Sequence, residues 1–510
     1  MVVLASSACI YIYVLVRDRS HQHKLPPGPS PTPIFGNFFQ LGSKPNESMA
    51  ELSKTYGPIM TLRLGHTLVV VVSSATMAKE VYQKNDQALA GRPSGEAIRV
   101  FDYDKLTMGW TPTGAHWRKI RMVCNTQIFS SKRLKADQGL RRQKVQELIA
   151  YIRKSSLRGQ AVNIGHATFF TVMNLLSSSI FSTDLIDISS DSGKELKNAV
   201  HGVIEEAGRA NLADHLPLLS LIDPQGVRRR ITSHFKKLYA VLDKLVDERV
   251  QSRASSKTFG QNDLLDVLLD HSQDHASEIN SPHIKPQIME LLMAGGDTTS
   301  VSLEWIMAEL VCNPNVMSKA RSEIKDIVGL VREVEESDIA RLPYLQAVIK
   351  ETLRLHPTAP LLIPHKAETS VEIGGYTVPK NTQVIVNAWA IGRDPKIWEN
   401  PSSFQPERFL GSNVDVKGQD YDLIPFGSGR RICPGMPFAL RTLHIILASL
   451  LHSFDWKLPD GMTPMDVNMD YKIGLNMQMK PNIFSGIDTD DTRCCHLLRR
   501  RRIRNVEFQR

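Results

Sequence analysis

The chain places one cysteine in a glycine-rich loop directly before an apolar segment with helical spacing. Residues 425–435 read Pro-Phe-Gly-Ser-Gly-Arg-Arg-Ile-Cys-Pro-Gly, with Cys433 near the end of the loop. Glycines permit a tight backbone whose amide N–H groups can point at the sulfur, and the apolar spacing after Phe438 predicts a helix. A thiolate held in this way suits a metal ion, because the metal deprotonates it and the amides orient it. A buried cysteine with a structural role is the alternative interpretation.

The other cysteines provide no competing metal site or disulfide framework. The chain has six cysteines, scattered apart from the adjacent pair at 494–495, and it contains no Cys-x-x-Cys. His444 and His452 lie too far along the chain to complete a local zinc site with Cys433. The pattern argues against a disulfide-rich secreted domain and favours a reducing compartment.

The longest helical pattern covers residues 283–312, with a predicted start at Pro286 and an end before Asn313-Pro314. Its centre, residues 294–300, reads Ala-Gly-Gly-Asp-Thr-Thr-Ser and has poor helix propensity. A helix that departs from local rules in its middle often does so at a functional site. The glycines would let a flat ligand approach, and a threonine hydroxyl can bond back to the preceding turn and open the helix. A tight Gly-Gly helix contact in the core is the alternative.

Further motifs flank this helix. Alternating and β-branched apolar residues over 60–72 predict a strand pair. Trp117 and Arg121 lie four apart, and Glu351 and Arg354 lie three apart, so each pair shares one face of a helix. Taken alone, these pairs are typical of an amphipathic helix and a surface salt bridge.

Together these segments resemble the cytochrome P-450 superfamily. Residues 426–435 match its heme-ligand loop, Phe-x-x-Gly-x-Arg-x-Cys-x-Gly, at every fixed position, and residues 294–299 match its Ala/Gly-Gly-x-Asp/Glu-Thr-Thr segment. Glu351-x-x-Arg354 and the Pro-Glu-Arg-Phe at 406–409 follow in the order typical of the family. The resemblance implies a mainly α fold with small β-sheets (α+β), in which a helical body surrounds a buried heme b.

The resemblance also assigns roles to individual residues. Cys433 would ligate the heme iron, while Asp297 and Thr298 would deliver protons to bound oxygen. Glu351, Arg354 and Arg408 would form a buried cluster that supports the cysteine loop. The remaining cofactor residues would shield the sulfur, pack closely or meet the heme propionates: Phe426, Gly435, Trp117, Arg121, His365 and Arg431.

The resemblance places a substrate pocket among distant segments of the chain. The loop at 98–108 would cap the pocket, residues 359–364 would form its edge, and the turn at 472–477 would touch substrate. Residues 212–222 correspond to a lid that dips into the membrane, and a plain buried loop is the alternative. The expected pocket residues are Ile98, Val100, Phe101, Ala294, Leu361, Leu362, Ile363, Ile473 and Leu475.

Within the superfamily, the sequence resembles the plant terpenoid-hydroxylating group, and most nearly abietane diterpene hydroxylases of the ferruginol synthase type. This implies hydroxylation of an apolar substrate, such as abietatriene to ferruginol, with a geraniol-type monoterpenoid as the alternative. Electrons would come from NADPH through a separate cytochrome reductase, because no Gly-x-Gly-x-x-Gly segment or appended reductase is present. A third hypothesis, rearrangement of a peroxide without O₂, does not explain the Asp297-Thr298 pair.

The chain divides into four predicted parts. Residues 1–17 form a short N-terminal membrane anchor followed by basic residues. A helix of about fifteen apolar residues is only about 22 Å long, which is shorter than the hydrocarbon core of about 30 Å. Residues 18–37 form a basic, proline-rich hinge expected to act as a stiff spacer. Residues 38–481 form the heme-thiolate domain. Residues 482–510 form an atypical basic tail, predicted to be disordered, which leaves a heme-binding protein without turnover as a further alternative.

The charge of the chain suggests its partners. The net charge is +9, and a basic surface suits anionic membrane lipid or an acidic electron-transfer partner. No motif indicates nucleic acid binding. We therefore expect a single-pass protein of the endoplasmic reticulum membrane with its catalytic domain in the cytosol. A cleaved signal peptide is the alternative, but the charges follow the apolar run instead of preceding it.

Overall fold

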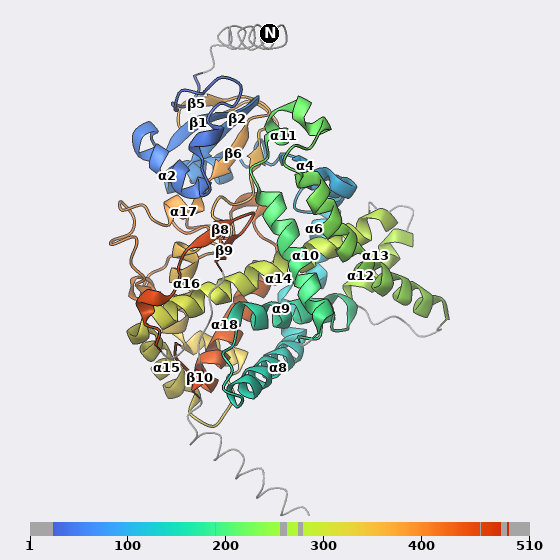
Figure 1. Ribbon diagram of the computed structural model, residues 1–510, viewed down its shortest axis with the longest axis vertical. Helices are drawn as coiled ribbons and strands as arrows, with labels where there is room; N and C mark the ends of the chain where they lie inside the picture. The colour runs from blue at the N-terminus through green and yellow to red at the C-terminus, as the bar shows by residue number, and fades with distance from the viewer. Residues whose placement is uncertain are drawn as a thin grey trace, which may run out of the picture.

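Helices make up most of the chain and short strands form small sheets, which confirms the predicted α+β fold (Figure 1). The computed structural model describes residues 24–188, 190–255, 263–273, 279–458, 461–480 and 487–488. The helices are α2 (Pro45–Tyr56), α3 (Ala75–Lys79), α4 (Glu96–Arg99), α5 (Tyr103–Leu106), α6 (Ala115–Gln127), α7 (Ser131–Ala136), α8 (Gln138–Ser156), α9 (Ile164–Phe181), α10 (Asp191–Gly208), α11 (Leu212–His215), α12 (Val227–Ser255), α13 (Leu264–Gln273), α14 (Ser281–Cys312), α15 (Pro314–Val328), α16 (Pro343–Leu355), α17 (Ala388–Ile391) and α18 (Met436–Ser453). The strands are β1 (Ile59–Leu64), β2 (Thr67–Val72), β3 (His365–Lys366), β4 (Val371–Ile373), β5 (Tyr376–Val378), β6 (Gln383–Val386), β7 (Asp455–Trp456), β8 (Tyr471–Ile473), β9 (Met477–Met479) and β10 (Ile487–Asp488).

The largest sheet joins the two halves of the chain. β1 and β2 form the predicted antiparallel pair, with Gly65 at a positive φ of 53° in the turn between them. β6 adds parallel to β2, and β3 adds antiparallel to β6, so that the strand order is β1-β2-β6-β3. Four valines of β2 are buried, as expected for a strand covered on both faces. The sheet thereby fixes His365, the first residue of β3.

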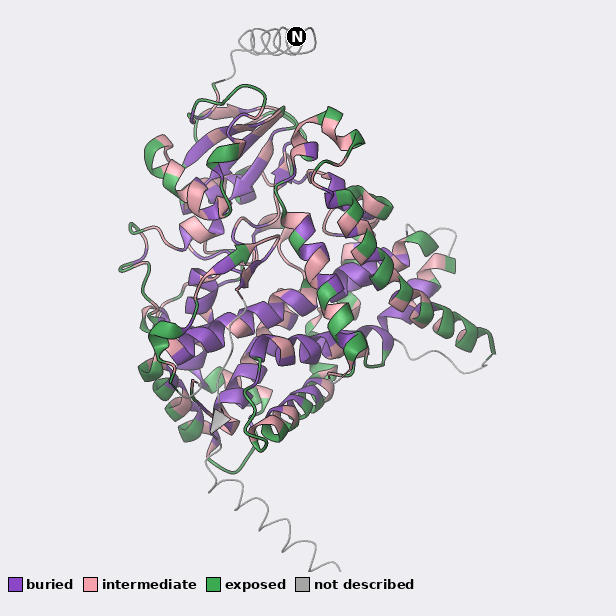
Figure 2. Cartoon of the chain, viewed as in Figure 1, coloured by how far each residue is buried: buried purple, intermediate pink, exposed green. Residues whose placement is uncertain are grey.

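Helix α14 crosses the centre of the helical body, with α9 packed along it (Figure 1). Figure 2 shows that both helices are mostly buried. Among the described residues only α9 is long and apolar enough to cross a membrane, and 83% of it is buried, so α9 is a core helix. The predicted end of α14 at Cys312 is confirmed. Its predicted start at Pro286 is wrong, because Asn280 caps the helix and Pro282 occupies its first turn, where a missing N–H costs nothing.

The described part of the proline-rich segment packs against the sheet. The Thr61 N–H donates to the carbonyl of Pro27 over 2.8 Å, and the Thr377 N–H donates to that of Lys24 over 2.9 Å. A Cβ at Gly28 would lie 1.9 Å from the Thr61 carbonyl oxygen, so only glycine allows this approach. From residue 24 onward, the segment expected to act as a stiff spacer is thus bonded to the strands of the domain. The expected anchor, residues 1–17, lies outside the described residues.

The C-terminal end contains two short strand pairs. β8 and β9 form a hairpin, and β10 pairs antiparallel with β7. Residues 487–488 are the described part of the predicted tail, and residues 482–486 and 489–510 lie outside the described part of the chain.

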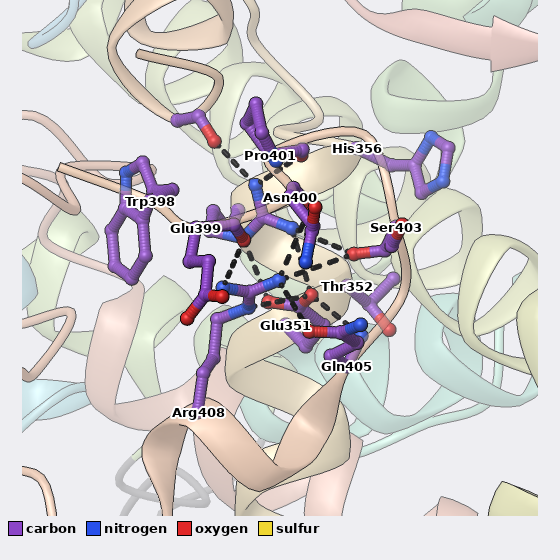
Figure 3. Close-up of polar contacts among 12 residues, drawn as sticks. Glu351, Thr352, His356, Trp398, Glu399, Asn400, Pro401, Ser403, Gln405 and Arg408 are labelled. Carbon is purple, nitrogen blue, oxygen red and sulfur yellow. Dashed lines mark hydrogen bonds and ion pairs between the residues drawn. The ribbon is translucent and has the colours of Figure 1, made fainter. Parts of the chain in front are cut away.

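A buried ionic cluster ties α16 to the loops before α18 (Figure 3). The Glu351 carboxylate accepts two hydrogen bonds from Arg354, at 2.7 Å each, and one from Arg408 at 3.0 Å. The backbone N–H of Gln405 adds a fourth donor at 2.8 Å. Arg354 also donates to the carbonyls of Gly392 and Pro401. Every charge in the cluster thus has several partners, which makes its burial tolerable.

We expect Arg354→Ala to lower the free energy of unfolding by about 3–5 kcal/mol, because it leaves the Glu351 carboxylate buried with half its donors. Denaturant unfolding followed by circular dichroism measures the loss. The matched control is Lys319→Ala, which removes an exposed 2.6 Å ion pair with Glu407 near the same loops and should cost less than about 1 kcal/mol. Equal losses for the two variants would contradict the proposed role of the cluster.

Candidate functional site

A cavity lies between the centre of α14 and the loop before α18. Its wall includes Cys433 and Phe438 on one side, and Ala294 and Thr298 of α14 on the other. Ala294 is exposed although α14 crosses the middle of the protein, because its side chain faces the open cavity. The thiol and the small-residue segment of the helix therefore line the same cavity, although they come from segments far apart in the chain.

The cysteine loop is held in shape by its own backbone. The Cys433 N–H donates to the Phe426 carbonyl over 3.0 Å, and Phe426 lines the cavity beside the sulfur. Gly429 has φ of 70°, and a Cβ there would lie 2.5 Å from a carboxylate oxygen of Asp86. That position therefore requires glycine.

The surroundings of the Cys433 thiol favour a bound cation. Burial raises its pKa, while the N–H groups of Gly435 and Met436 and the charge of Arg121 lower it. The amides thus point at the sulfur as expected for a thiolate ligand. A Cβ at Gly435 would lie 3.8 Å from the sulfur, an ordinary contact distance. Within the described residues, no group of three His, Cys, Asp or Glu side chains could hold a metal ion.

Three guanidinium groups gather at one side of the cavity. Arg431 and Arg121 lie 5.3 and 5.9 Å from the centre of the Trp117 ring, and Trp117 donates from Nε1 to the Met108 carbonyl over 3.0 Å. Arg92 is the third cation, and burial together with the charge of Arg431 lowers its pKa to about 9. Burial also lowers the pKa of Arg431 to about 10. The three guanidinium groups therefore repel one another at a site that water solvates poorly.

His365 lies beside these arginines. Its Nδ1 is 2.6 Å from the Leu89 carbonyl, and burial lowers its pKa well below its ordinary value, so the ring is neutral. In the described cavity wall Glu290 is the only carboxyl group. One carboxyl group against three guanidinium groups leaves positive charge uncompensated. A heme, with two carboxylates and an iron for the thiolate, fits this donor set.

The catalytic pair expected on α14 is split between two surroundings. Thr298 lines the cavity, and its hydroxyl donates to the Ala294 carbonyl over 2.5 Å, which is the expected bond to the preceding turn. The helix nevertheless remains continuous. Asp297 is fully buried and points away from the cavity: its carboxylate lies 2.9 Å from His201 Nε2 and accepts a 2.6 Å hydrogen bond from Asn476.

The structure brings five of the expected pocket residues to the cavity wall: Ile98, Ala294, Leu362, Ile363 and Leu475. It places four others elsewhere: Val100, Phe101, Leu361 and Ile473. Phe101 has a positive φ of 57° and is 44% exposed, so the chain turns its ring outward, where it contacts Tyr239. Ile473 lies in β8, where side chains alternate between faces, and packs into the cluster around Trp305. Leu361 packs toward the large sheet.

Sequence reasoning missed a second group of wall residues. They come from α5, α10, α12 and α14 and from the end of the loop at 90–92: Tyr103, Val203, Ile204, Ala207, Phe235, Glu290 and Arg92. The α10 and α12 residues belong to ordinary amphipathic helices, so periodicity marks them only as core. An Arg-Pro pair after an apolar run was the only available signal for Arg92.

The family model for Cytochrome P-450 matches residues 26–484. Two similar plant proteins cover most of the chain. Geraniol 8-hydroxylase of Catharanthus roseus is 51% identical, over 88% of this chain and 90% of its own length. Ferruginol synthase of Isodon rubescens is 47% identical, over 87% and 90% respectively.

A solved structure shows the same fold. A zebra fish cytochrome P-450 structure with progesterone aligns with a TM-score of 0.75 at 26% sequence identity, and the alignment covers 87% of this chain and 99% of that one.

We expect Arg92→Gln to reduce the heme bound per protein chain, because it removes one of three cations that would face the heme carboxylates. Arg118→Gln on α6 is the matched control, because Arg118 is exposed. The heme-to-protein ratio and the rate of heme transfer to apomyoglobin measure the effect. Unchanged heme retention in Arg92→Gln would contradict this role.

Proposed function

Because the chain belongs to the cytochrome P-450 family, we propose that it hydroxylates a terpenoid with O₂ and with electrons that a separate reductase passes from NADPH. The protein is a P-450 monooxygenase with a heme-thiolate cofactor. Relatives named for a monoterpenoid and for a diterpenoid product both support the terpenoid class. Two substrates fit this class: an abietane-type diterpene, which the sequence motifs favour, and a geraniol-type monoterpenoid, which the 51% identical relative favours.

The observation that carries the proposal is the apolar wall of the cavity opposite Cys433. It is built from α4, α10, α12, α14 and two loops, and its members include Ile98, Val203, Ile204, Phe235, Leu291, Leu362 and Leu475. Such a wall binds hydrocarbon by removing apolar area from water, at about 25 cal/mol per Å². A charged or strongly polar substrate would lose hydration there without compensation.

The chain itself would position the cofactor and move protons. Cys433 would hold the heme iron, and Arg92, Arg121 and Arg431 would face the carboxylates. The heme supplies the activation of oxygen once bound. Thr298 presents a hydroxyl to the cavity, and Asp297 precedes it with a buried carboxylate that reaches His201, a side chain 33% exposed. We propose that protons pass from solvent through His201 and Asp297 toward Thr298, as positioned acid–base groups allow.

The membrane location is also part of the proposal. Three apolar side chains, Leu218, Leu221 and Ile222, are 83%, 78% and 68% exposed. They follow α11, which lies at the same end of the protein as the first described residues (Figure 1). An exposed apolar patch of this kind supports contact with lipid. Residues 46–48 read Asn-Glu-Ser, which matches a glycosylation sequon. Asn46 is fully buried and its side chain donates to the Tyr471 hydroxyl, so it could not carry a glycan in the folded protein.

Co-expression with a plant cytochrome reductase tests the activity. We expect microsomes supplied with NADPH to convert geraniol or abietatriene into a product heavier by one oxygen atom, because the cavity suits apolar terpenoids. Mass spectrometry of products made under labelled O₂ identifies the source of the oxygen. A normal heme spectrum without any oxidised terpenoid would instead support a heme-binding protein without turnover.

We expect Thr298→Ala to lower the product formed per NADPH by about tenfold or more, and to raise release of hydrogen peroxide, because proton delivery loses its hydroxyl. Thr298→Ser, which keeps the hydroxyl, should retain most of the coupling. Parallel measurement of NADPH, product and peroxide provides the comparison. If Thr298→Ala formed as much product per NADPH as the wild-type protein, Thr298 would have no role in proton delivery.

A further inference from the structure

Glu290 of α14 carries the one carboxyl group in the described cavity wall, and it is 8% exposed. It has no part in the proposed hydroxylation chemistry. A buried carboxyl group is costly unless donors hold it. Its donors come from α14 itself and from the loop of residues 107–111, which lies between α5 and α6. These donors indicate what the residue holds in place.

Helix α14 holds the backbone of this loop through two side chains. The Gly109 N–H donates to Oε1 of Glu290 over 2.9 Å, and Gln287 donates from Nε2 to its Oε2 over 3.1 Å. Gln287 lies three residues earlier on the same face of the helix, and its Oε1 accepts from the Met108 N–H over 2.9 Å. Burial raises the pKa of Glu290, while these donors and the Thr107 hydroxyl group lower it. The carboxyl group therefore has its donors in the loop and in the helix.

The close approach of the carboxyl group requires glycine at position 109. A Cβ on Gly109 would lie 2.5 Å from Oε1 of Glu290 and 3.5 Å from its Cδ. A side chain there would push the carboxyl group away from the N–H group that it accepts from. Gly109 and Glu290 are thus fitted to each other, although 181 residues separate them in the chain.

The carbonyl groups of the same loop bind two of the three guanidinium groups. The Gly109 carbonyl accepts from Nε of Arg92 over 3.1 Å and from Nη1 of Arg431 over 3.3 Å. The Thr111 carbonyl accepts from Nη2 of Arg431 over 2.6 Å. The position of the loop therefore sets where both cations lie in the cavity.

A single peptide group connects Glu290 with these partners. In the peptide between Met108 and Gly109, the N–H donates to Glu290, while the C=O accepts from Nε1 of Trp117 over 3.0 Å and from Arg431 over 3.4 Å. The C=O and N–H of a planar trans peptide point in opposite directions. Hydrogen bonds in such a chain polarise one another. The carboxyl group on one side thus orients and strengthens the acceptor on the other side.

We infer that Glu290 is a positioning residue for the heme. It fixes the 107–111 loop, and the loop carbonyls hold Arg92, Arg431 and Trp117 where they meet the heme carboxylates. Glu290 acts through the loop and not by contact with the heme. This inference rests on the heme-thiolate part of the proposed function and is independent of the substrate.

The charge of Glu290 adds a second effect. Burial lowers the pKa of Arg92 to about 9 and that of Arg431 to about 10, and the charge of Glu290 opposes both shifts. The variant Glu290→Gln separates the two effects, because it removes the charge and keeps an oxygen atom for the Gly109 N–H. Glu290→Leu removes both.

Heme transfer from the purified holoprotein to excess apomyoglobin tests the inference. We expect Glu290→Leu to speed heme release by about tenfold or more, because the buried Gly109 N–H loses its acceptor and the loop is no longer fixed. Glu290→Gln should speed it by about threefold. Gly109→Ala, which displaces the carboxyl group from the side of the loop, should also speed release.

Glu304→Leu is the matched control. Glu304 lies on the same helix, and burial raises its pKa to about 7 as well, but it lies outside the described cavity wall. Heme release from Glu304→Leu should stay close to the wild-type rate. Equal acceleration by Glu290→Leu and Glu304→Leu would overturn the inference.

Hydrogen exchange followed by mass spectrometry reports on the loop directly. We expect the amides of residues 107–111 to exchange about tenfold faster or more in Glu290→Leu, because they lose their acceptors on α14. The amides of α9, which packs along α14, should keep their wild-type rates. Unchanged exchange in the loop, or equal acceleration in α9, would contradict a role that acts through the loop.

A double-mutant cycle with Arg92→Gln shows whether Glu290 acts through the cations. In the Arg92→Gln background, Glu290→Leu should speed heme release by no more than about threefold, because one cation that the loop holds is already absent. The same factor in both backgrounds would mean that Glu290 serves only the stability of the helix.

This inference and the proposed function can fail separately. If Glu290→Leu retains heme as well as the wild-type protein and terpenoids are hydroxylated, the proposed function survives and the inference fails. If Glu290→Leu releases heme rapidly with a loosened loop, but the wild-type protein oxidises no terpenoid, the inference survives and the proposed function fails.

Discussion

A partly buried thiol and the small-residue segment of a long helix line one cavity, and three guanidinium groups line the same cavity. Burial of Cys433 opposes its ionisation, and burial of Arg92 and Arg431 opposes their charges. A single bound group would offset the cost of ionising Cys433 and the cost of burying the arginine charges. It would contain a metal ion that binds the thiolate and carboxylates that pair with the guanidinium groups. The heme of the cytochrome P-450 family is such a group.

The rest of the fold holds the residues that line this cavity in place. The Glu351 cluster ties α16 to the loops that lead to the cysteine, and the large sheet fixes His365 beside Arg92 and Arg431. On the opposite wall, Asn476 of the turn between β8 and β9 both lines the cavity and holds Asp297. The turn that was expected to contact substrate is therefore also linked to the expected proton donor.

How much the sequence predicted depends on the range of the interactions involved. The cysteine loop, the central helix and the β1–β2 pair follow from local spacing and turn chemistry, and the structure contains all three. Cavity residues depend on which face of an element meets a distant one. Ile473 is the last residue of β8 and packs around Trp305, whereas Leu475 lies in the turn between β8 and β9 and reaches the cavity, because the chain reverses direction there. Asp297 and Thr298 likewise adjoin in sequence but face different surroundings.

X-ray absorption at the iron edge of the purified ferric protein tests the central claim most directly. We expect one sulfur atom bound to iron at about 2.3 Å, a distance typical of metal–thiolate bonds, and loss of that sulfur signal in Cys433→His. A shell of nitrogen and oxygen atoms alone, or a sulfur signal that persists in Cys433→His, would contradict it.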